Sequence, residues 1–290
     1  MAAKRIAFTF DDVPRGPGAF LDLEERAPRL VSELREHHVS QVAFFVNPGR
    51  ISNSDRDEDR ISFYTSAGHV IGDHSFSHPG LSRVSARAYL EDIDRSEDWL
   101  RGRPGYRPWF RFPFLDEGGP DKAKRDAIRD GLAARGLRNA HVTVDGSDWN
   151  MEQLAIDAKK SGKPIDLEAL RALYVETHLQ SANFADALAL RAVGRSPVHV
   201  MLLHETDLAA LFIGDLVDAL RRDGWEIVPV DQAYADPVYA ASPDVEWASG
   251  TLIEALAWEK HLPKPRWYER NDLKVANPLF AERVLNEKVR

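Results

Sequence analysis

Seven apolar segments, most of them rich in β-branched and aromatic residues, alternate with longer stretches of helical pattern along the 290-residue chain. The strand candidates are residues 5–10, 41–46, 68–72, 108–112, 139–144, 198–203 and 226–230. Helical patterns fill the intervals, at about 22–37, 57–67, 85–101, 120–135, 151–193 and 207–223. Strands that alternate with helices pair in parallel through right-handed crossovers. The pattern predicts an α/β fold, an incomplete (β/α)7 TIM-like barrel, with a doubly wound open sheet as the alternative.

Two regions depart from this alternation. Residues 150–197 are too long for one crossover helix, so we expect a helical insertion of two or three helices outside the barrel or over its site. We therefore expect one barrel domain over residues 1–234 and a C-terminal extension, residues 235–290, packed on it. The extension contains three tryptophans that we expect to anchor it by burial, unless one ring stacks on a ligand: Trp247, Trp258 and Trp267.

Composition excludes some classes of chemistry. The chain has no cysteine, which rules out disulfides, thiolate ligands and cysteine nucleophiles. A formal net charge of −8 argues against nucleic acid as the main partner. No segment approaches the run of about 20 apolar residues that a membrane span needs. The sequence passes from a short basic start directly into a strand pattern, so we expect a cytoplasmic protein, or a secreted one whose signal has been trimmed.

In either architecture the functional site lies at the carboxyl ends of the parallel strands. Most of the side chains in this sequence that are suited to acid, base or metal chemistry stand at such ends. They are Asp11-Asp12, Asn47, Asp73-His74, Arg111, the segment from Asp145 to Trp149, and His204-Glu205.

A metal site is the first hypothesis that these residues suggest. His74 and His78 stand four residues apart, and without cysteine a transition metal must be held by imidazole and carboxylate groups. Asp11 and Asp12 are adjacent after an apolar strand, where like charges repel and lose solvation. A cation resolves this pair if one aspartate ligates it while the other acts as a base toward its water. The alternatives are a turn stabilised by histidines and a pair of aspartates of which one caps the next segment.

Hydrolysis also needs a general acid. His204 ends the strand at 198–203 and is our candidate, with Asp148 orienting and charging it. The alternative for His204 is a core histidine that bonds to the backbone. Arg111 follows an apolar strand, where a lone guanidinium is unfavourable, so we expect it to pair with Asp11 and to keep that carboxylate ionised.

Five short motifs occur in order, each at a predicted strand end: TFDD (9–12), HSFSH (74–78), RFPF (111–114), DGSDW (145–149) and LLH (202–204). Together they resemble the motifs of the polysaccharide deacetylases, the NodB-homology enzymes of carbohydrate esterase family 4. The resemblance covers about residues 4–231. It implies a barrel of the NodB-homology type and hydrolysis of N-acetyl or O-acetyl groups of a carbohydrate, with metal-bound water as the nucleophile.

The resemblance also implies a role for each motif residue. Asp11 would be the general base, and the metal ligands would be Asp12, His74 and His78. The metal would be zinc first, with cobalt or nickel as alternatives. Arg111 would hold Asp11, and Asp148 would tune His204, the general acid. The substrate-binding residues would be Trp149 and Leu202, which wall a pocket for the acetyl methyl group, and Pro113 and Phe114, whose loop offers a backbone N–H to the oxyanion.

The sequence departs from the family pattern at two rim positions. Val13 and Leu115 stand where the family usually has glycine, so we expect a side chain at the rim at both positions, where it either narrows the cleft or changes the substrate. The substrate therefore stays open among chitin-like, peptidoglycan, xylan and small-metabolite classes, as does the oligomeric state. Two other functions remain alternatives, a related amidohydrolase acting on a small cyclic imide or ureide and a non-catalytic carbohydrate-binding relative.

Overall fold

A computed structural model describes residues 4–52 and 55–288 of the chain. Within these residues one sheet has the strand order β6-β4-β3-β2-β1-β8-β7, with β9 also paired to β1. Every pairing in this sheet is parallel. The bounds are β1 Lys4–Val13, β2 Ala43–Val46, β3 Val70–Asp73, β4 Tyr106–Phe110, β6 Arg138–Asn139, β7 Val144–Asp145, β8 Val198–His204 and β9 Trp225–Ile227.

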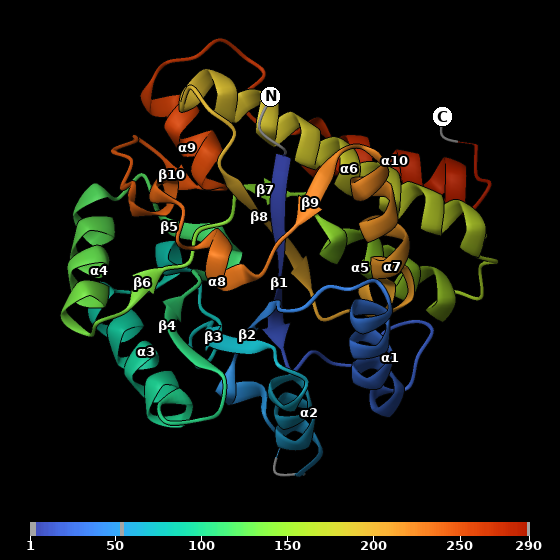
Figure 1. Ribbon diagram of the computed structural model, residues 1–290, viewed down its shortest axis with the longest axis horizontal. Coiled ribbons are helices and arrows are strands. Elements are labelled where there is room, and N and C mark those ends of the chain that lie inside the picture. The colour runs from blue at the N-terminus through green and yellow to red at the C-terminus, as the bar shows by residue number, and fades with distance from the viewer. Residues whose placement is uncertain (1–3, 53–54, 289–290) are drawn as a thin grey trace.

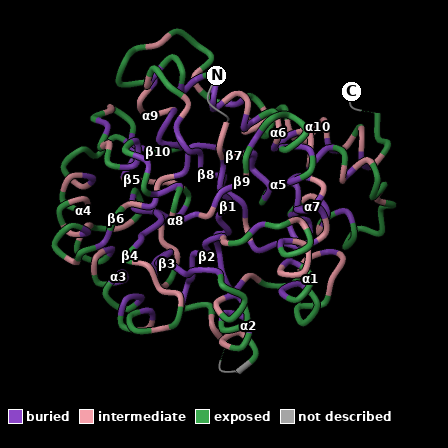
Figure 2. The backbone as a smooth tube through the Cα atoms, viewed as in Figure 1, coloured by how far each residue is buried: buried purple, intermediate pink, exposed green. Residues whose placement is uncertain are grey.

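Helices surround this curled sheet (Figure 1). Those that follow the strands of the barrel are α1 Leu23–Glu36, α2 Asp55–Ser66, α3 Ala86–Leu100, α4 Lys122–Ala134, α7 Asp207–Arg222 and the short α8 Val230–Ala233. The central strands β1, β2, β3 and β8 are largely buried and the outer surfaces of the helices are exposed, as Figure 2 shows. The expected incomplete (β/α) barrel is confirmed.

Strand β1 is the centre of the sheet. Ile6 pairs with His199 of β8 on one side and with Ile227 of β9 on the other, while β2 pairs with the later part of the strand. All residues of β1 after Arg5 are buried, because the sheet and helices cover both of its faces. The carboxyl end of β1 therefore lies between the ends of β2 and β8, where side chains of several strands can meet.

Two predicted strands are shorter than expected. The segment 139–144 divides into β6 and β7, and the carbonyl of Ala140 between them accepts hydrogen bonds from the Arg111 guanidinium and the Tyr234 hydroxyl. The segment 226–230 stops at Ile227, because Pro229 has no N–H to donate and Val230 already begins α8.

The region 150–197 contains two long helices, α5 Asp148–Lys160 and α6 Leu167–Ala192. Helix α6 packs against α7 and against the C-terminal helices α9 Leu252–Glu259 and α10 Leu273–Val284. The extension also adds β10 Ala248–Ser249, which pairs in antiparallel fashion with β5 Asp116–Gly119. No helix of the described residues is both long and apolar enough to cross a membrane.

The tryptophans of the extension do not anchor it, contrary to the expectation of burial. Trp247 is 66% exposed, and Trp258 and Trp267 are each about half exposed. Smaller side chains do the packing instead: Leu252, Ile253 and Ala257 of α9 and Phe280 and Val284 of α10 are all buried. Trp258 lies on the exposed side of α9, away from its buried residues, and Trp247 and Trp267 lie in irregular segments outside the helices.

Candidate metal centre and active site

The two adjacent aspartates of β1 reach the same imidazole. The Nε2 atom of His74 lies 3.7 Å from Asp11 Oδ2 and 3.7 Å from Asp12 Oδ1. Neighbouring residues of a regular strand point to opposite faces. Here the register between β1 and β2 is irregular after Phe10, and Asp12 has a φ of +70°. This irregularity turns the second carboxylate back toward the site.

The loop after β3 presents both histidines. Asp73 accepts a hydrogen bond from the backbone N–H of Ser75 at 2.7 Å, and the Asn47 amide donates to the carbonyls of His74 and Ser75. Gly72 is required by close packing, because a Cβ atom there would lie 2.8 Å from the ring of Phe45. Asn47 and Asp73 thus fix the backbone of the loop at His74 and Ser75 through hydrogen bonds.

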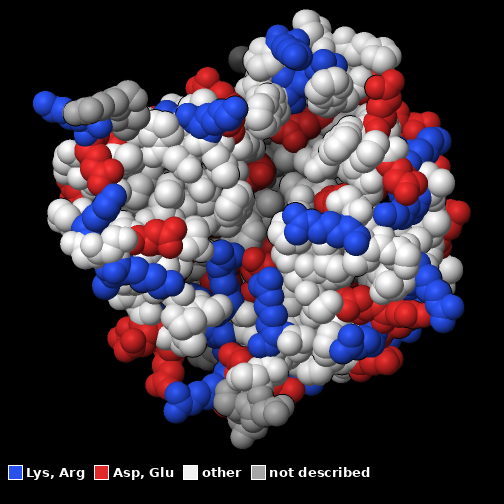
Figure 3. All heavy atoms as spheres, turned by 180° about the vertical axis from the view of Figure 1, so that it is seen from behind, with Lys and Arg blue, Asp and Glu red and all other residues white. Residues whose placement is uncertain are grey.

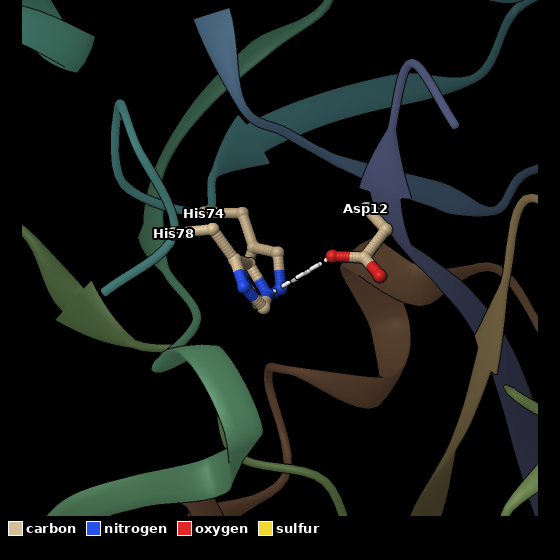
Figure 4. A group of neighbouring side chains, drawn as sticks. All are labelled: Asp12, His74 and His78. Carbon is tan, nitrogen blue, oxygen red and sulfur yellow. Dashed lines mark ion pairs between the residues drawn. The ribbon is translucent and has the colours of Figure 1, made fainter. Parts of the chain in front are cut away.

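Asp12, His74 and His78 form a compact group. Their candidate ligand atoms all lie within 4.8 Å of one another, and His78 Nε2 is 2.9 Å from Asp12 Oδ1. Figure 4 shows the three side chains converging from β1 and the loop after β3. Within the residues that the structure describes, no other group of three or more such side chains meets this geometry.

The protonation states of this group suit a cation. Burial lowers the pKa of His74 well below its usual value, and its Nδ1 donates to the carbonyl of Arg111 at 2.8 Å. Its Nε2 therefore keeps a lone pair that faces Asp12. Although burial alone would raise it, the pKa of Asp12 lies well below its usual value because of the histidines and Arg50 around it. Asp12 Oδ1 is buried and accepts no well-aligned hydrogen bond from the described residues, although His78 Nε2 and Arg50 Nη1 lie 2.9 and 3.0 Å from it. This oxygen is therefore available to a cation.

Arg111 and Asp11 form a buried ion pair, as the sequence predicts. Nη1 of Arg111 lies 3.0 and 3.1 Å from the two carboxylate oxygens, and Nη2 bonds to the hydroxyl of Tyr234 at 2.9 Å. Burial raises the pKa of Asp11 to about 6 against the opposing charge of Arg111. The arginine thus limits the effect of burial without cancelling it, and Asp11 is ionised at neutral pH.

His204 lies at the end of β8, beside Asp11 of β1 in the sheet register. Its Nδ1 is 2.7 Å from Asp148 Oδ1, and its backbone N–H donates to Asp148 Oδ2 at 2.8 Å. Burial opposes a charge on the ring, but Asp148 prevails and raises the pKa of His204 above its usual value. Asp148 therefore favours the imidazolium form of His204 more than water does for a free histidine.

The remaining expected residues stand around this centre. Leu202 is buried on the same face of β8 as His204, two residues before it, and Trp149 begins α5 next to Asp148 and is 38% exposed. Pro113 is buried, whereas Phe114 is 61% exposed, has a φ of +59° and lies with its ring 4.6 Å from that of His78.

The expectation that Val13 places its side chain at the rim of the cleft is wrong. Val13 is fully buried in the main hydrophobic core, because it follows the turned residue Asp12 and points back into the barrel. Leu115 is partly buried and packs against a second apolar cluster, which includes Leu202.

Sequence reasoning missed two arginines that contact Asp12. Nη1 of Arg15 lies 2.8 Å from Asp12 Oδ2, and Nη1 of Arg50 lies 3.0 Å from Asp12 Oδ1. Arg50 is the last residue of the short 3-10 helix Pro48–Arg50, which follows β2. The expectation that functional side chains lie after strand ends therefore applied to it as well. Basic side chains also lie beside a hollow in the middle of the face shown in Figure 3.

Comparisons with known proteins agree with this geometry. The family model for polysaccharide deacetylase matches residues 1–134, which include both aspartates, both histidines and Arg111. A peptidoglycan-N-acetylglucosamine deacetylase of Bacillus cereus is 32% identical over 37% of this chain and 35% of its own length. A chitin deacetylase of Colletotrichum lindemuthianum is 25% identical over 80% of this chain and 79% of its own length.

The chain therefore spans about a third of the bacterial relative and most of the fungal one. The solved structure of the fungal chitin deacetylase shares the fold, with a TM-score of 0.57, 20% identity, and coverage of 80% of this chain and 87% of that chain. The motifs, the fold and the family-model match over residues 1–134 thus make this chain similar to the polysaccharide deacetylases.

Proposed function

We propose that the protein is a metal-dependent deacetylase that hydrolyses N-acetyl, or O-acetyl, groups of a carbohydrate. The observation that carries this proposal is that three potential metal ligands lie beside two ion pairs. Asp12, His74 and His78 converge on one point, with the Asp11–Arg111 and His204–Asp148 pairs beside it. The carbohydrate is inferred from relatives that are named for chitin and for peptidoglycan N-acetylglucosamine.

Asp12, His74 and His78 would hold the metal, for which we propose zinc. Two imidazoles and one carboxylate form a ligand set typical of hydrolytic zinc, with positions left for water and substrate. When bound, such an ion polarises a carbonyl oxygen and lowers the pKa of water. The buried Asp12 Oδ1, which accepts no hydrogen bond from the described residues, supports this assignment.

Asp11 is the proposed general base. A carboxylate with a pKa of about 6 is ionised at neutral pH and still basic enough to accept a proton from the attacking water. Arg111 fixes its orientation through contacts with both oxygens and makes no contact with the substrate in this scheme.

His204 is the proposed general acid. Its raised pKa favours the protonated ring. The contact of Asp148 with Nδ1 leaves Nε2 to donate the proton to the departing amine or alkoxide. At the same pH, Asp11 can be deprotonated and His204 protonated because their surroundings differ. A pair that acts as general base and general acid needs this difference in protonation.

The proposed substrate contacts are Trp149 and Leu202 for the acetyl methyl group and Pro113 and Phe114 on the opposite side. Trp149 and Phe114 combine large apolar surface with partial exposure, which suits contact with a sugar or acetyl group. We propose that the backbone N–H of the Phe114 loop helps to stabilise the oxyanion.

The experiment is acetate release from a panel of N-acetylated and O-acetylated glycans, before and after treatment with a chelator. We expect chelation to abolish release and zinc to restore it, with cobalt and nickel tested in parallel. Asp12→Asn should lose bound metal and activity, whereas Asp130→Asn, an exposed aspartate on α4, should lose neither. Full activity in the presence of the chelator would exclude the metal mechanism.

A further inference from the structure

Two arginines contact the carboxylate of Asp12 in different ways. Arg15 donates a hydrogen bond from Nη1 to Oδ2 at 2.8 Å. Arg50 lies 3.0 Å from Oδ1, but this contact lacks hydrogen-bond geometry, since Oδ1 accepts no hydrogen bond from the described residues. Oδ1 is also the oxygen that faces the Nε2 atoms of His74 and His78.

Arg15 is fixed in place by its backbone. Its N–H donates to the buried carboxylate of Glu205 at 2.7 Å, and its carbonyl accepts from the guanidinium groups of Arg26 and Arg60. Its contact with Oδ2 does not compete with ligation through Oδ1. Arg15 therefore acts as a positioning residue for Asp12.

The side chain of Arg50 has no such support. It ends a single turn of 3-10 helix, Pro48–Arg50, is 35% exposed, and donates no hydrogen bond to the residues that the structure describes. Its one counter-charge in that part of the chain is Asp12. When Asp12 Oδ1 serves as a metal ligand, Arg50 shares the charge of this carboxylate with the ion and keeps five N–H donors beside the site.

The charge around the site then becomes strongly positive. Asp11 and Asp12 face three guanidinium groups, those of Arg15, Arg50 and Arg111, before any cation is added. A guanidinium that is beside a metal and shares its protein counter-charge with the ion attracts an anionic ligand, and its planar fork matches a carboxylate or a phosphate in two parallel hydrogen bonds.

We propose that Arg50 is a specificity-determining residue that binds an anionic group, a carboxylate or a phosphate, carried by the acetylated saccharide near its acetyl group. This inference rests on the proposed deacetylase function and narrows its substrate from neutral glycans to acidic ones. A neutral chitin-like chain offers Arg50 no charged partner.

The first test compares acetate release from three N-acetylhexosamine oligosaccharides that differ in one group: neutral, carboxylate-bearing and phosphate-bearing. We expect the zinc-loaded protein to prefer the carboxylate-bearing or the phosphate-bearing oligosaccharide over the neutral one. The oligosaccharide that is preferred shows which of the two anionic groups Arg50 binds. In Arg50→Gln the ratio of kcat/KM for that substrate over the neutral one should fall about 10- to 100-fold, the loss expected for one charge-assisted contact. The control is Arg87→Gln, because Arg87 is exposed on α3 and, among the described residues, pairs only with Glu91.

The second test is independent of turnover. Inorganic phosphate is titrated calorimetrically into the zinc-loaded wild-type, Arg50→Gln and Arg87→Gln proteins. We expect binding to weaken about 10-fold in Arg50→Gln alone. An unchanged substrate ratio together with unchanged phosphate affinity overturns the role of Arg50 and leaves the deacetylase proposal intact. If no substrate releases acetate, the deacetylase proposal fails, and the phosphate titration alone decides whether Arg50 binds anions.

Discussion

Asp148 holds His204 through both of its carboxylate oxygens, one on the ring Nδ1 at 2.7 Å and the other on the backbone N–H at 2.8 Å. The aspartate is fully buried at the start of α5, and the histidine ends β8. The two contacts fix the orientation of the ring and favour its charged form. A histidine held in this way can keep its proton at a pH where a free imidazole would lose it.

Asp148→Asn tests this relationship. The amide removes the negative charge that raises the pKa of His204, while it can still accept from the backbone N–H. A general acid is active only while protonated, so the alkaline limb of the pH–activity profile should move to lower pH, and kcat/KM at neutral pH should fall about 100-fold or more. A profile with an unmoved alkaline limb would contradict the role of Asp148. Asp130→Asn serves as the control.

The Arg111–Asp11 pair predicts a non-additive effect on stability. Arg111→Met leaves the buried Asp11 carboxylate without its counter-charge, so the free energy of unfolding should fall by about 3–5 kcal/mol in urea titrations at pH 7.5. Asp11→Asn combined with Arg111→Met removes both charges and should recover part of this loss. Additive losses in the double variant would mean that the two side chains stabilise the fold independently.

The three potential metal ligands predict that binding of a metal ion stabilises the fold. Asp12, His74 and His78 come together only in the folded chain, so zinc should raise the midpoint of thermal unfolding. At 100 times its Kd an ion that binds only the folded state adds about 2.7 kcal/mol. His78→Ala should abolish most of the zinc-induced shift, while His261→Ala, in the loop after α9, should retain it. Equal shifts in both variants would place the ion elsewhere.

The positions of the candidate metal ligands and of the ion pairs could be predicted from the sequence because most of these residues stand at or shortly after the end of a strand. Parallel strands bring their carboxyl ends together whatever the lengths of the intervening helices, so Asp12, His74 and Arg111 had to be neighbours once the fold was known. The roles proposed for these residues come from the resemblance of the ordered motifs to the deacetylases.

Features that depend on local backbone geometry could not be predicted in this way. The turn of Asp12 into the site and the burial of Val13 follow from an irregular register that no residue pattern shows. Arg50 was missed because its importance comes from a contact with Asp12 across the sheet. The three tryptophans were misjudged because an aromatic ring gains from burial only where its helix or loop turns it toward the core.

The last prediction concerns Glu152, a carboxylate buried between α5 and the start of α7. It accepts hydrogen bonds from the N–H groups of Asp207 and Leu208. Burial, together with the nearby charge of Asp207, raises the pKa of Glu152 to about 7. The unfolded chain has the ordinary value near 4.5, so between the two pKa values the folded state binds more protons than the unfolded state.

Stability from this group is therefore fully present below about pH 4.5 and is lost as the pH rises through about 7, by up to roughly 3 kcal/mol. Glu152→Gln carries no titrating proton and can still accept one of the two backbone hydrogen bonds. We expect the variant to lose less stability than the wild type between pH 5 and pH 8, measured by urea unfolding at both values. Glu246→Gln changes an exposed glutamate and should reproduce the wild-type dependence. A wild-type slope in Glu152→Gln would show that Glu152 is ionised in the folded protein throughout this range. Its charge would then be offset by Arg26 of α1, which pairs with Asp207 at the start of α7.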